Sequence, residues 1–281
     1  MSRRWPWQAI VVTSPNGERL RIAYLSRPGR GVPVFCLHGM GSSRLAFWPW
    51  FQRTRLENPL YALDLPGYGA SSLPRRRQTL EDMVWAAWAA AQELVPDRPR
   101  LWVGHSMGGM VAAEAALREP RNAVGVILIA GAGIIAPQNT FQPTPWPWVN
   151  RIGIWVTGTA WFGVRILRAM GLDPDRVGTE DRARLRYGWR TAREMARFGR
   201  FYESPNLLAR LREAGVPVVG LWGDHDIIFP LVQVEAATRG ALPIRVMSGA
   251  GHLPMDYDLE RFDAELSAMI GDLCREREAP A

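Results

Sequence analysis

The chain has 281 residues, enough for one large domain with a modest insertion. Hydrophobic residues make up 47% of the chain and charged residues 22%, which is ordinary for a folded soluble domain. The formal net charge of +7 suits acidic surfaces or nucleic acid, but no nucleic-acid-binding motif is present, so no such partner is expected.

Several other protein classes are excluded by what the sequence lacks. Two cysteines, Cys36 and Cys274, are too few for a disulfide framework, and Cys36 lies in an apolar run that predicts its burial. No run of about 18 apolar residues is present, so no membrane span is predicted. The N-terminus carries arginines without an apolar stretch behind them, so we expect no signal peptide and a cytoplasmic protein.

The first part of the chain predicts four strands and one helix. Asn16-Gly17, between two short apolar runs, is typical of a β-hairpin. The helix begins after Thr79, a good N-cap residue, and Pro96 follows its end. The predicted strands cover 9–13, 20–25, 32–37 and 60–63, and the helix covers 79–94.

The remaining core predicts strands that alternate with helices. A strand over 101–103 leads directly into a helix over 107–117, and Pro120 marks the end of that helix. Later strands are expected at 124–130, 216–222 and 244–247, with helices at 231–238 and 259–273. This alternation predicts an α/β fold with a parallel, doubly wound sheet.

The segment 137–202 breaks the alternation. Its proline-rich opening, 143–148, prevents a regular helix, and two helical patches follow at 152–170 and 179–201. We interpret the segment as a helical lid inserted into a core formed by 1–136 and 203–281; ordinary core helices are the alternative. Arginines share one face of the second patch. This face is interpreted either as a solvated basic face or as a docking face for an anionic membrane or an acidic substrate.

Gly104-His105-Ser106-Met107-Gly108 fits the G-x-S-x-G pattern and lies between a predicted strand and a predicted helix. In that context the serine occupies a sharp, strained turn that exposes its hydroxyl. A side chain at Gly104 or Gly108 would collide with the neighbouring strand or helix. The turn therefore predicts Ser106 as a nucleophile, with a surface serine in a glycine-rich turn as the alternative.

A serine hydroxyl needs an adjacent base, and the chain has four histidines. His252, in a glycine-rich loop after the last strand, is the predicted base, whereas His105 lies inside the serine turn and should point away from Ser106. Asp226, after a buried strand, is the predicted carboxylate that orients the imidazole, and Asp224 is interpreted as a turn cap. The order Ser106, Asp226, His252 differs from that of chymotrypsin and of subtilisin.

Acyl transfer also needs hydrogen-bond donors for the oxyanion that forms. The backbone N–H of Met107, directly after the nucleophile, is one candidate. Met40, in the loop His38-Gly39-Met40-Gly41, is the other. The sequence has no metal-ligand cluster, no dinucleotide glycine pattern and no P-loop, so no metal or cofactor is implied.

Five stretches belong together: His38-Gly-Met-Gly, Asp64-Leu-Pro-Gly-Tyr-Gly-Ala-Ser, Gly104-His-Ser-Met-Gly-Gly, Gly223-Asp-His-Asp-Ile-Ile-Phe-Pro and Gly251-His. In combination they resemble the α/β-hydrolase family. The resemblance implies an eight-stranded, mostly parallel sheet with an antiparallel second strand, flanking helices and a helical cap after the sixth strand. It also implies Ser106, Asp226 and His252 as nucleophile, acid and base, with Met40 and Met107 as oxyanion donors. A serine at 106 argues against the dehalogenase and epoxide hydrolase branches, whose nucleophile is an aspartate.

The resulting expectation is a carboxylesterase for small-molecule esters with short- to medium-chain or aromatic acyl groups. Apolar side chains that suit its acyl pocket, or else packed core, are those of Met40, Phe47, Trp48, Met107, Trp146, Trp148, Trp155 and Trp161. Alternatives are a carbon–carbon bond hydrolase of vinylogous diketo acids, with Arg190 holding a substrate carboxylate, and an acyltransferase or perhydrolase. A ligand-binding protein on the same fold is the non-enzyme alternative.

Overall fold

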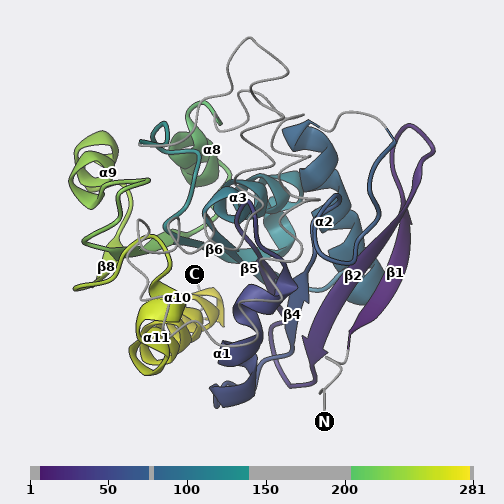
Figure 1. Cartoon of the computed structure of the whole chain (residues 1–281), viewed down its shortest axis with the longest axis horizontal. Helices are drawn as coiled ribbons and strands as arrows, with labels where there is room; N and C mark the ends of the chain where they lie inside the picture. Colours follow the sequence, from purple (N-terminus) through teal and green to yellow (C-terminus); the bar gives the residue numbers. More distant parts are fainter. Residues whose placement is uncertain (1–6, 76–78, 139–203, 279–281) are drawn as a thin grey trace, which may run out of the picture.

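The computed structural model describes residues 7–75, 79–138 and 204–278, and in these residues eight strands form one mixed sheet (Figure 1). The order across the sheet is β1-β2-β4-β3-β5-β6-β7-β8. β2 is antiparallel to both of its neighbours, and the remaining neighbouring strands are parallel to each other. This confirms the predicted fold class. The strands are β1 Gln8–Thr13, β2 Arg19–Arg27, β3 Val34–Leu37, β4 Leu60–Leu63, β5 Arg100–His105, β6 Ala123–Ile129, β7 Val218–Gly223 and β8 Ile244–Met247.

Helices cover both faces of the sheet (Figure 1). One apolar core lies between the sheet and α2, α3, α8 and α9, and a second lies between the sheet and η1, α1, α10 and α11. The helices are η1 Arg44–Phe47, α1 Trp48–Arg53, α2 Leu80–Leu94, α3 Met107–Arg118, η2 Pro120–Asn122, α8 Leu207–Glu213, α9 Leu231–Thr238, α10 Pro254–Tyr257 and α11 Leu259–Glu278.

The central strands are apolar on both sides because each side meets one of these cores. In β6, Val126 and Leu128 belong to the first core, and Ile127 and Ile129 belong to the second. Side chains alternate between the faces of a strand, so a strand covered on both faces reads as a continuous apolar run. This confirms the interpretation of the apolar runs as doubly buried strands.

The helix ends follow local sequence chemistry in one case and tertiary contacts in another. At the start of α2, the Thr79 hydroxyl accepts the Asp82 N–H at 3.2 Å, and the Asp82 carboxylate accepts the Thr79 N–H at 2.9 Å. α11 continues past its predicted end at 273, because the Arg277 guanidinium donates to the carbonyl of Arg121 at 2.7 Å. Exposed polar residues in that last turn hide the continuation from apolar periodicity.

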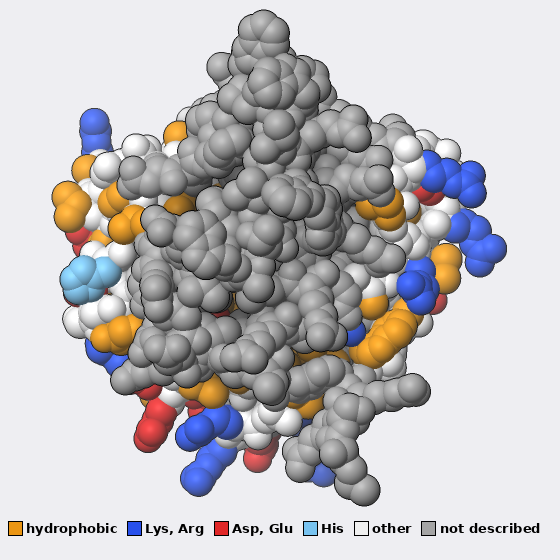
Figure 2. Space-filling view, in the orientation of Figure 1, with side chains coloured by type: hydrophobic (Ala, Val, Ile, Leu, Met, Phe, Trp, Pro, Cys, Tyr) orange, Lys and Arg blue, Asp and Glu red, His pale blue; other side chains and the backbone are white. Residues whose placement is uncertain are grey.

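The predicted lid, 137–202, lies outside the described residues apart from Pro137 and Gln138, and so does its arginine-rich face. Among the described helices, none is both long enough and apolar enough to cross a bilayer. On the face shown in Figure 2, basic side chains gather over the β1–β2 edge, whereas acidic and basic side chains are mixed near α11.

The carboxyl ends of the parallel strands meet at one edge of the sheet. Leu37 of β3 pairs with Gly104 of β5, and Ile129 of β6 pairs with Leu221 of β7. After β3 the chain moves to β4 on one side, and it later returns to β5 on the other side. Loops diverge at such a switch point and leave a crevice, which is where open α/β sheets bind ligands.

Candidate active site

Ser106 lies at this switch point, between the end of β5 and the first turn of α3. Its backbone has φ 53° and ψ −122°, a left-handed conformation that costs energy for a residue with a side chain. Hydrogen bonds hold the strained backbone in place: its N–H donates to the Ile129 carbonyl and its carbonyl accepts from Gly109 and Ala132, each at 2.9 Å. The predicted strand–turn–helix context is therefore present, and the serine is partly exposed.

The two glycines of the motif are required by close backbone approach. A Cβ on Gly104 would lie 2.1 Å from the Gly108 carbonyl oxygen. A Cβ on Gly108 would lie 2.2 Å from the carbonyl oxygen of Leu37, at the end of β3. Both distances are impossible for real side chains, so the predicted steric conflict with the neighbouring helix and strand is confirmed.

Ser106, His252 and Asp226 form a continuous hydrogen-bonded chain. The Ser106 Oγ is 3.0 Å from His252 Nε2, and His252 Nδ1 is 2.9 Å from Asp226 Oδ2. His252 and Asp226 are each only 3% exposed. For the serine hydroxyl to donate to Nε2, the imidazole proton must sit on Nδ1 and point at the carboxylate, which is the tautomer that a general base needs.

The β7–α9 loop holds the Asp226 carboxylate in a defined orientation. Its Oδ1 accepts the backbone N–H groups of Ile228 at 2.8 Å and Phe229 at 3.0 Å, which leaves Oδ2 for the imidazole. Asp224 has a different role from the expected cap of its own turn, because its carboxylate accepts the Gly249 N–H at 2.7 Å. It thereby connects the loop of Asp226 to the loop of His252.

The other three histidines do not bond to the serine hydroxyl in the described structure. The His105 Nε2–H donates to the backbone carbonyl of His252 at 2.8 Å, and the two rings lie 5.0 Å apart. His225 is exposed and pairs with Asp224. Sequence reasoning missed the support that His105 provides to His252, because no local pattern connects residues so far apart in the chain.

His38, at the end of β3, is fully buried with both ring nitrogens in hydrogen bonds. Its Nε2 accepts the Leu65 N–H at 3.1 Å, so its proton lies on Nδ1, which faces the Gly39 carbonyl at 2.8 Å. Burial lowers the pKa of His38, although the Asp64 carboxylate and the Gly39 carbonyl oppose the shift. The imidazole is therefore neutral and structural, and it anchors the start of the loop that carries Met40.

Met107 and the loop that carries Met40 both lie next to Ser106. Met107 is the first residue of α3, and the N–H groups of a first helical turn have no partner within the helix. The helix dipole also favours negative charge at this end. In the facing loop, a Cβ on Gly39 would lie 3.0 Å from the Ser106 Cβ, and Met40 follows directly.

The candidate pocket residues are placed as follows. Phe47 is fully buried in the core against α1 and α11, and Trp48 packs on the same cluster, which favours packing over pocket lining for Phe47. Met40 is partly buried against the other core. Trp146, Trp148, Trp155 and Trp161 lie outside the described residues, as does Arg190.

Comparison with protein families matches residues 34–265 to the alpha/beta hydrolase family. That stretch contains the serine elbow, the aspartate and the histidine. The chain belongs to the alpha/beta hydrolase family. Among the residues that the structure describes, no group of three histidine, cysteine, aspartate or glutamate side chains is arranged to hold a metal ion.

Distant relatives of this alpha/beta hydrolase include esterases and an acetyltransferase component. The chain is 24% identical to the pimeloyl-[acyl-carrier protein] methyl ester esterase of Xylella fastidiosa (strain 9a5c), over 89% of this chain and 99% of that protein. It is also 28% identical, over 90% of this chain, to the dihydrolipoyllysine-residue acetyltransferase component of the acetoin cleaving system of Cupriavidus necator, of which 67% is covered.

Solved structures show the same fold. A thermophilic esterase from Thermogutta terrifontis matches with a TM-score of 0.70 and 23% identity, over 95% of this chain and 99% of that one. An esterase from Rhodococcus sp. ECU1013 matches with a TM-score of 0.74 and 20% identity, over 94% of this chain and 99% of that one. These likenesses support the alpha/beta hydrolase architecture.

Proposed function

We propose that this alpha/beta hydrolase cleaves carboxylic esters through an acyl-enzyme formed on Ser106. The observation that carries the proposal is the hydrogen-bonded chain from Ser106 through His252 to Asp226 at the carboxyl edge of the sheet. A partly exposed serine with a correctly oriented imidazole is suited to nucleophilic attack at a carbonyl carbon. The esterases among the relatives also support ester hydrolysis.

The reaction follows from the positions of these groups. His252 Nε2 takes the Ser106 proton as Oγ attacks the ester carbonyl carbon, and the carbonyl π electrons move onto oxygen. The N–H groups of Met40 and Met107 stabilise that oxyanion. As the tetrahedral intermediate collapses, the alkoxide leaves with the proton from His252. Water then attacks the acyl-enzyme by the same sequence and releases the acid.

The proposed substrates are esters of short- to medium-chain or aromatic acids. Support comes from relatives that are named as ester hydrolases, including methyl ester esterases.

Hydrolysis of p-nitrophenyl esters from acetate to palmitate, by wild type and by Ser106→Ala, tests the proposal. We expect wild-type turnover with a preference for one range of acyl lengths. In Ser106→Ala the rate should fall on the order of 10⁶-fold, because the nucleophile is lost. Mass spectrometry after treatment with a fluorophosphonate should locate the adduct on Ser106.

Two results would contradict the proposal in different ways. An enzyme that is labelled on Ser106 but hydrolyses no ester has the nucleophile and a different substrate class, and vinylogous diketo acids are then the next substrates to assay. An enzyme that is neither labelled nor active is not a serine hydrolase.

A further inference from the structure

The loop that carries one proposed oxyanion donor passes directly beside the nucleophile. It joins β3 to η1 and spans residues 38–43. Gly39 is so close to Ser106 that a Cβ atom would lie 3.0 Å from that of the serine. A displacement of about 1 Å at a catalytic group can lower a rate by about 10²-fold. The position of this loop therefore determines whether the Met40 N–H can act as an oxyanion donor.

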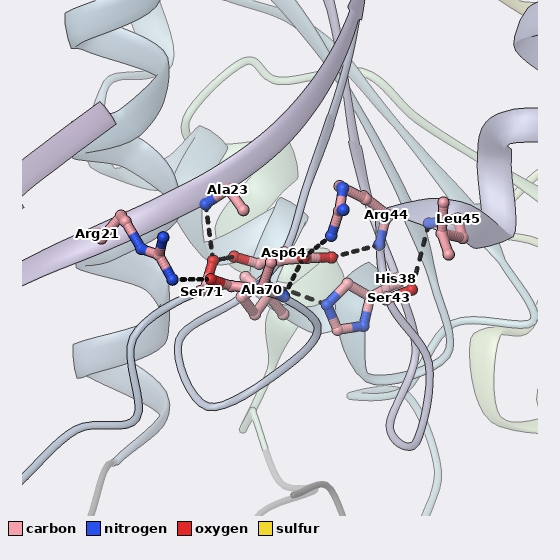
Figure 3. A network of polar contacts seen from close by, with 10 residues as sticks. Arg21, Ala23, His38, Ser43, Arg44, Leu45, Asp64, Ala70 and Ser71 are labelled. Carbon is pink, nitrogen blue, oxygen red and sulfur yellow. Dashed lines mark hydrogen bonds and ion pairs between the residues drawn. The ribbon is translucent and has the colours of Figure 1, made fainter. Parts of the chain in front are cut away.

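The two ends of this loop are bonded to two consecutive residues that follow β4, one end to Leu65 and the other to Asp64 (Figure 3). At the start, the Leu65 N–H donates to His38 Nε2 at 3.1 Å. At the end, the Arg44 N–H donates to Asp64 Oδ1 at 2.6 Å, and the Arg44 guanidinium pairs with Asp64 Oδ2. Asp64-Leu65 therefore clamps the 38–43 loop from both sides.

Further hydrogen bonds hold Asp64 in position (Figure 3). Its Oδ2 accepts the Ala70 N–H at 2.7 Å, and its backbone carbonyl accepts the Ser71 hydroxyl at 2.7 Å. The Ser71 hydroxyl oxygen in turn accepts the Ala23 N–H of β2 at 2.9 Å. The clamp is thus continuous with the sheet.

The ion pair within the clamp is buried, with 3% of the Arg44 side chain exposed and none of the Asp64 side chain. Separating such a pair leaves an unpaired buried charge, so the pair resists displacement strongly. Among the described residues the Arg44 Nε has no hydrogen-bond partner, and the guanidinium also lies over the Trp7 ring, 5.4 Å from the ring centroid.

We propose that Arg44 and Asp64 are positioning residues for the oxyanion hole. Their ion pair holds the 38–43 loop, and with it the Met40 N–H, at the distance from Ser106 that the developing oxyanion requires. The pair is buried, so it acts through the loop and not by contact with the substrate. This inference rests on the proposed function to the extent that both use Ser106 as the nucleophile.

The test measures how fast Ser106 reacts with a p-nitrophenyl phosphonate, which needs the nucleophile and the oxyanion hole but not the natural substrate. His252 Nε2 takes the Ser106 proton as the serine oxygen bonds to phosphorus, p-nitrophenolate leaves, and the phosphoryl oxygen occupies the oxyanion hole. Arg44→Gln keeps a donor for Asp64 and loses the charge, and we expect its reaction to be about 10- to 100-fold slower. Arg44→Lys keeps a cation and should retain most of the wild-type rate.

Arg100 provides a matched control. It is also a buried arginine, 1% exposed, with an Nη1 atom that has no partner in the described part of the chain. It begins β5, whereas Ser106 follows the end of β5, so it lies at the opposite edge of the sheet. Arg100→Gln should lose stability in the way that Arg44→Gln does. Its rate of reaction with the phosphonate, per folded molecule, should nevertheless equal that of wild type.

The outcomes separate this proposal from the proposed function. If folded Arg44→Gln reacts at the wild-type rate, or if Arg100→Gln slows in proportion, the positioning role is wrong. If wild type is phosphonylated but hydrolyses no ester, ester hydrolysis is wrong and the labelling rates still decide the role of Arg44. A wild-type enzyme that the phosphonate does not label overturns both. A slow Arg44→Gln beside a normal Arg100→Gln and a largely restored Arg44→Lys supports the proposal.

Discussion

Two buried carboxylates at the same edge of the sheet are held in nearly the same way. Asp226 accepts the N–H groups of Ile228 and Phe229 and faces His252 at 2.9 Å. Asp64 accepts the N–H groups of Arg44 and Ala70 and faces the Arg44 guanidinium. Each carboxylate therefore combines two backbone donors with one basic side chain.

The difference between the two lies in the basic partner. An imidazole gains and loses a proton near neutral pH, whereas a guanidinium stays charged. The carboxylate beside His252 can stabilise a charge that comes and goes during a reaction. The carboxylate beside Arg44 meets a permanent charge and can only fix a geometry. Under the two proposals above, the same local arrangement serves proton transfer in one loop and positioning in the other.

The largest expected effect that distinguishes the loops is that of Asp226→Asn on turnover. An amide would favour the wrong imidazole tautomer, so kcat for ester hydrolysis should fall about 10⁴-fold while the folded structure is retained. Steady-state kinetics at neutral pH measure this. Asp224→Asn, two residues away, should change kcat far less, and equal losses in both variants would refute the assignment of Asp226.

For stability, unlike for turnover, the substitution at the Arg44–Asp64 pair should have a larger effect than the substitution at Asp226. Arg44→Met leaves the buried Asp64 charge unpaired, so the free energy of unfolding should fall by about 3–5 kcal/mol. Asp226→Asn should cost clearly less, because its amide oxygen still accepts from the β7–α9 loop. Urea denaturation of both variants checks the order, and a greater loss in Asp226→Asn would contradict it.

A pH effect is expected from the anchor at the start of the 38–43 loop. Burial lowers the pKa of His38 below its ordinary value of 6.5. Between the folded pKa of His38 and 6.5, the unfolded chain binds a proton that the folded chain does not. The stability contributed by neutral His38 is therefore complete above pH 6.5, and it is lost as the pH falls toward the folded pKa. The slope from one proton is at most about 1.4 kcal/mol per pH unit.

Unfolding free energies of wild type and His38→Asn, measured from about pH 8 to about pH 5, isolate this contribution. The substitution should flatten the acid side of the stability curve. Parallel curves for the two proteins would show that His38 does not titrate differently in the folded and unfolded states.

The smallest expected effect calibrates the others. Thr79→Ala removes the capping box of α2 and should cost about 1 kcal/mol of stability. Its kcat per folded molecule should equal that of wild type. A reduced kcat in this variant would mean that general destabilisation alone lowers turnover, and the losses at Asp226 and Arg44 would need correction for it.

The sequence by itself determined the strands, the bounds of α2, α3 and α9, and the serine elbow. The helical elements η1, α1, η2, α8 and α10 were not predicted. These depend mostly on interactions between near neighbours: apolar periodicity, the Asn16-Gly17 turn, the Thr79 cap, and Gly104, where a Cβ would meet the Gly108 carbonyl. Chain order and loop context also selected Ser106, Asp226 and His252, which the structure brings into hydrogen-bond contact.

Only the tertiary structure decided which polar groups meet across the loops. Arg44 and Asp64 are 20 residues apart, and His38 and Leu65 are 27 apart. His105 and the His252 carbonyl are 147 apart. No local pattern encodes such pairs, because they form only where parallel strands bring their carboxyl ends to one edge and burial favours hydrogen bonds between the polar groups that meet there.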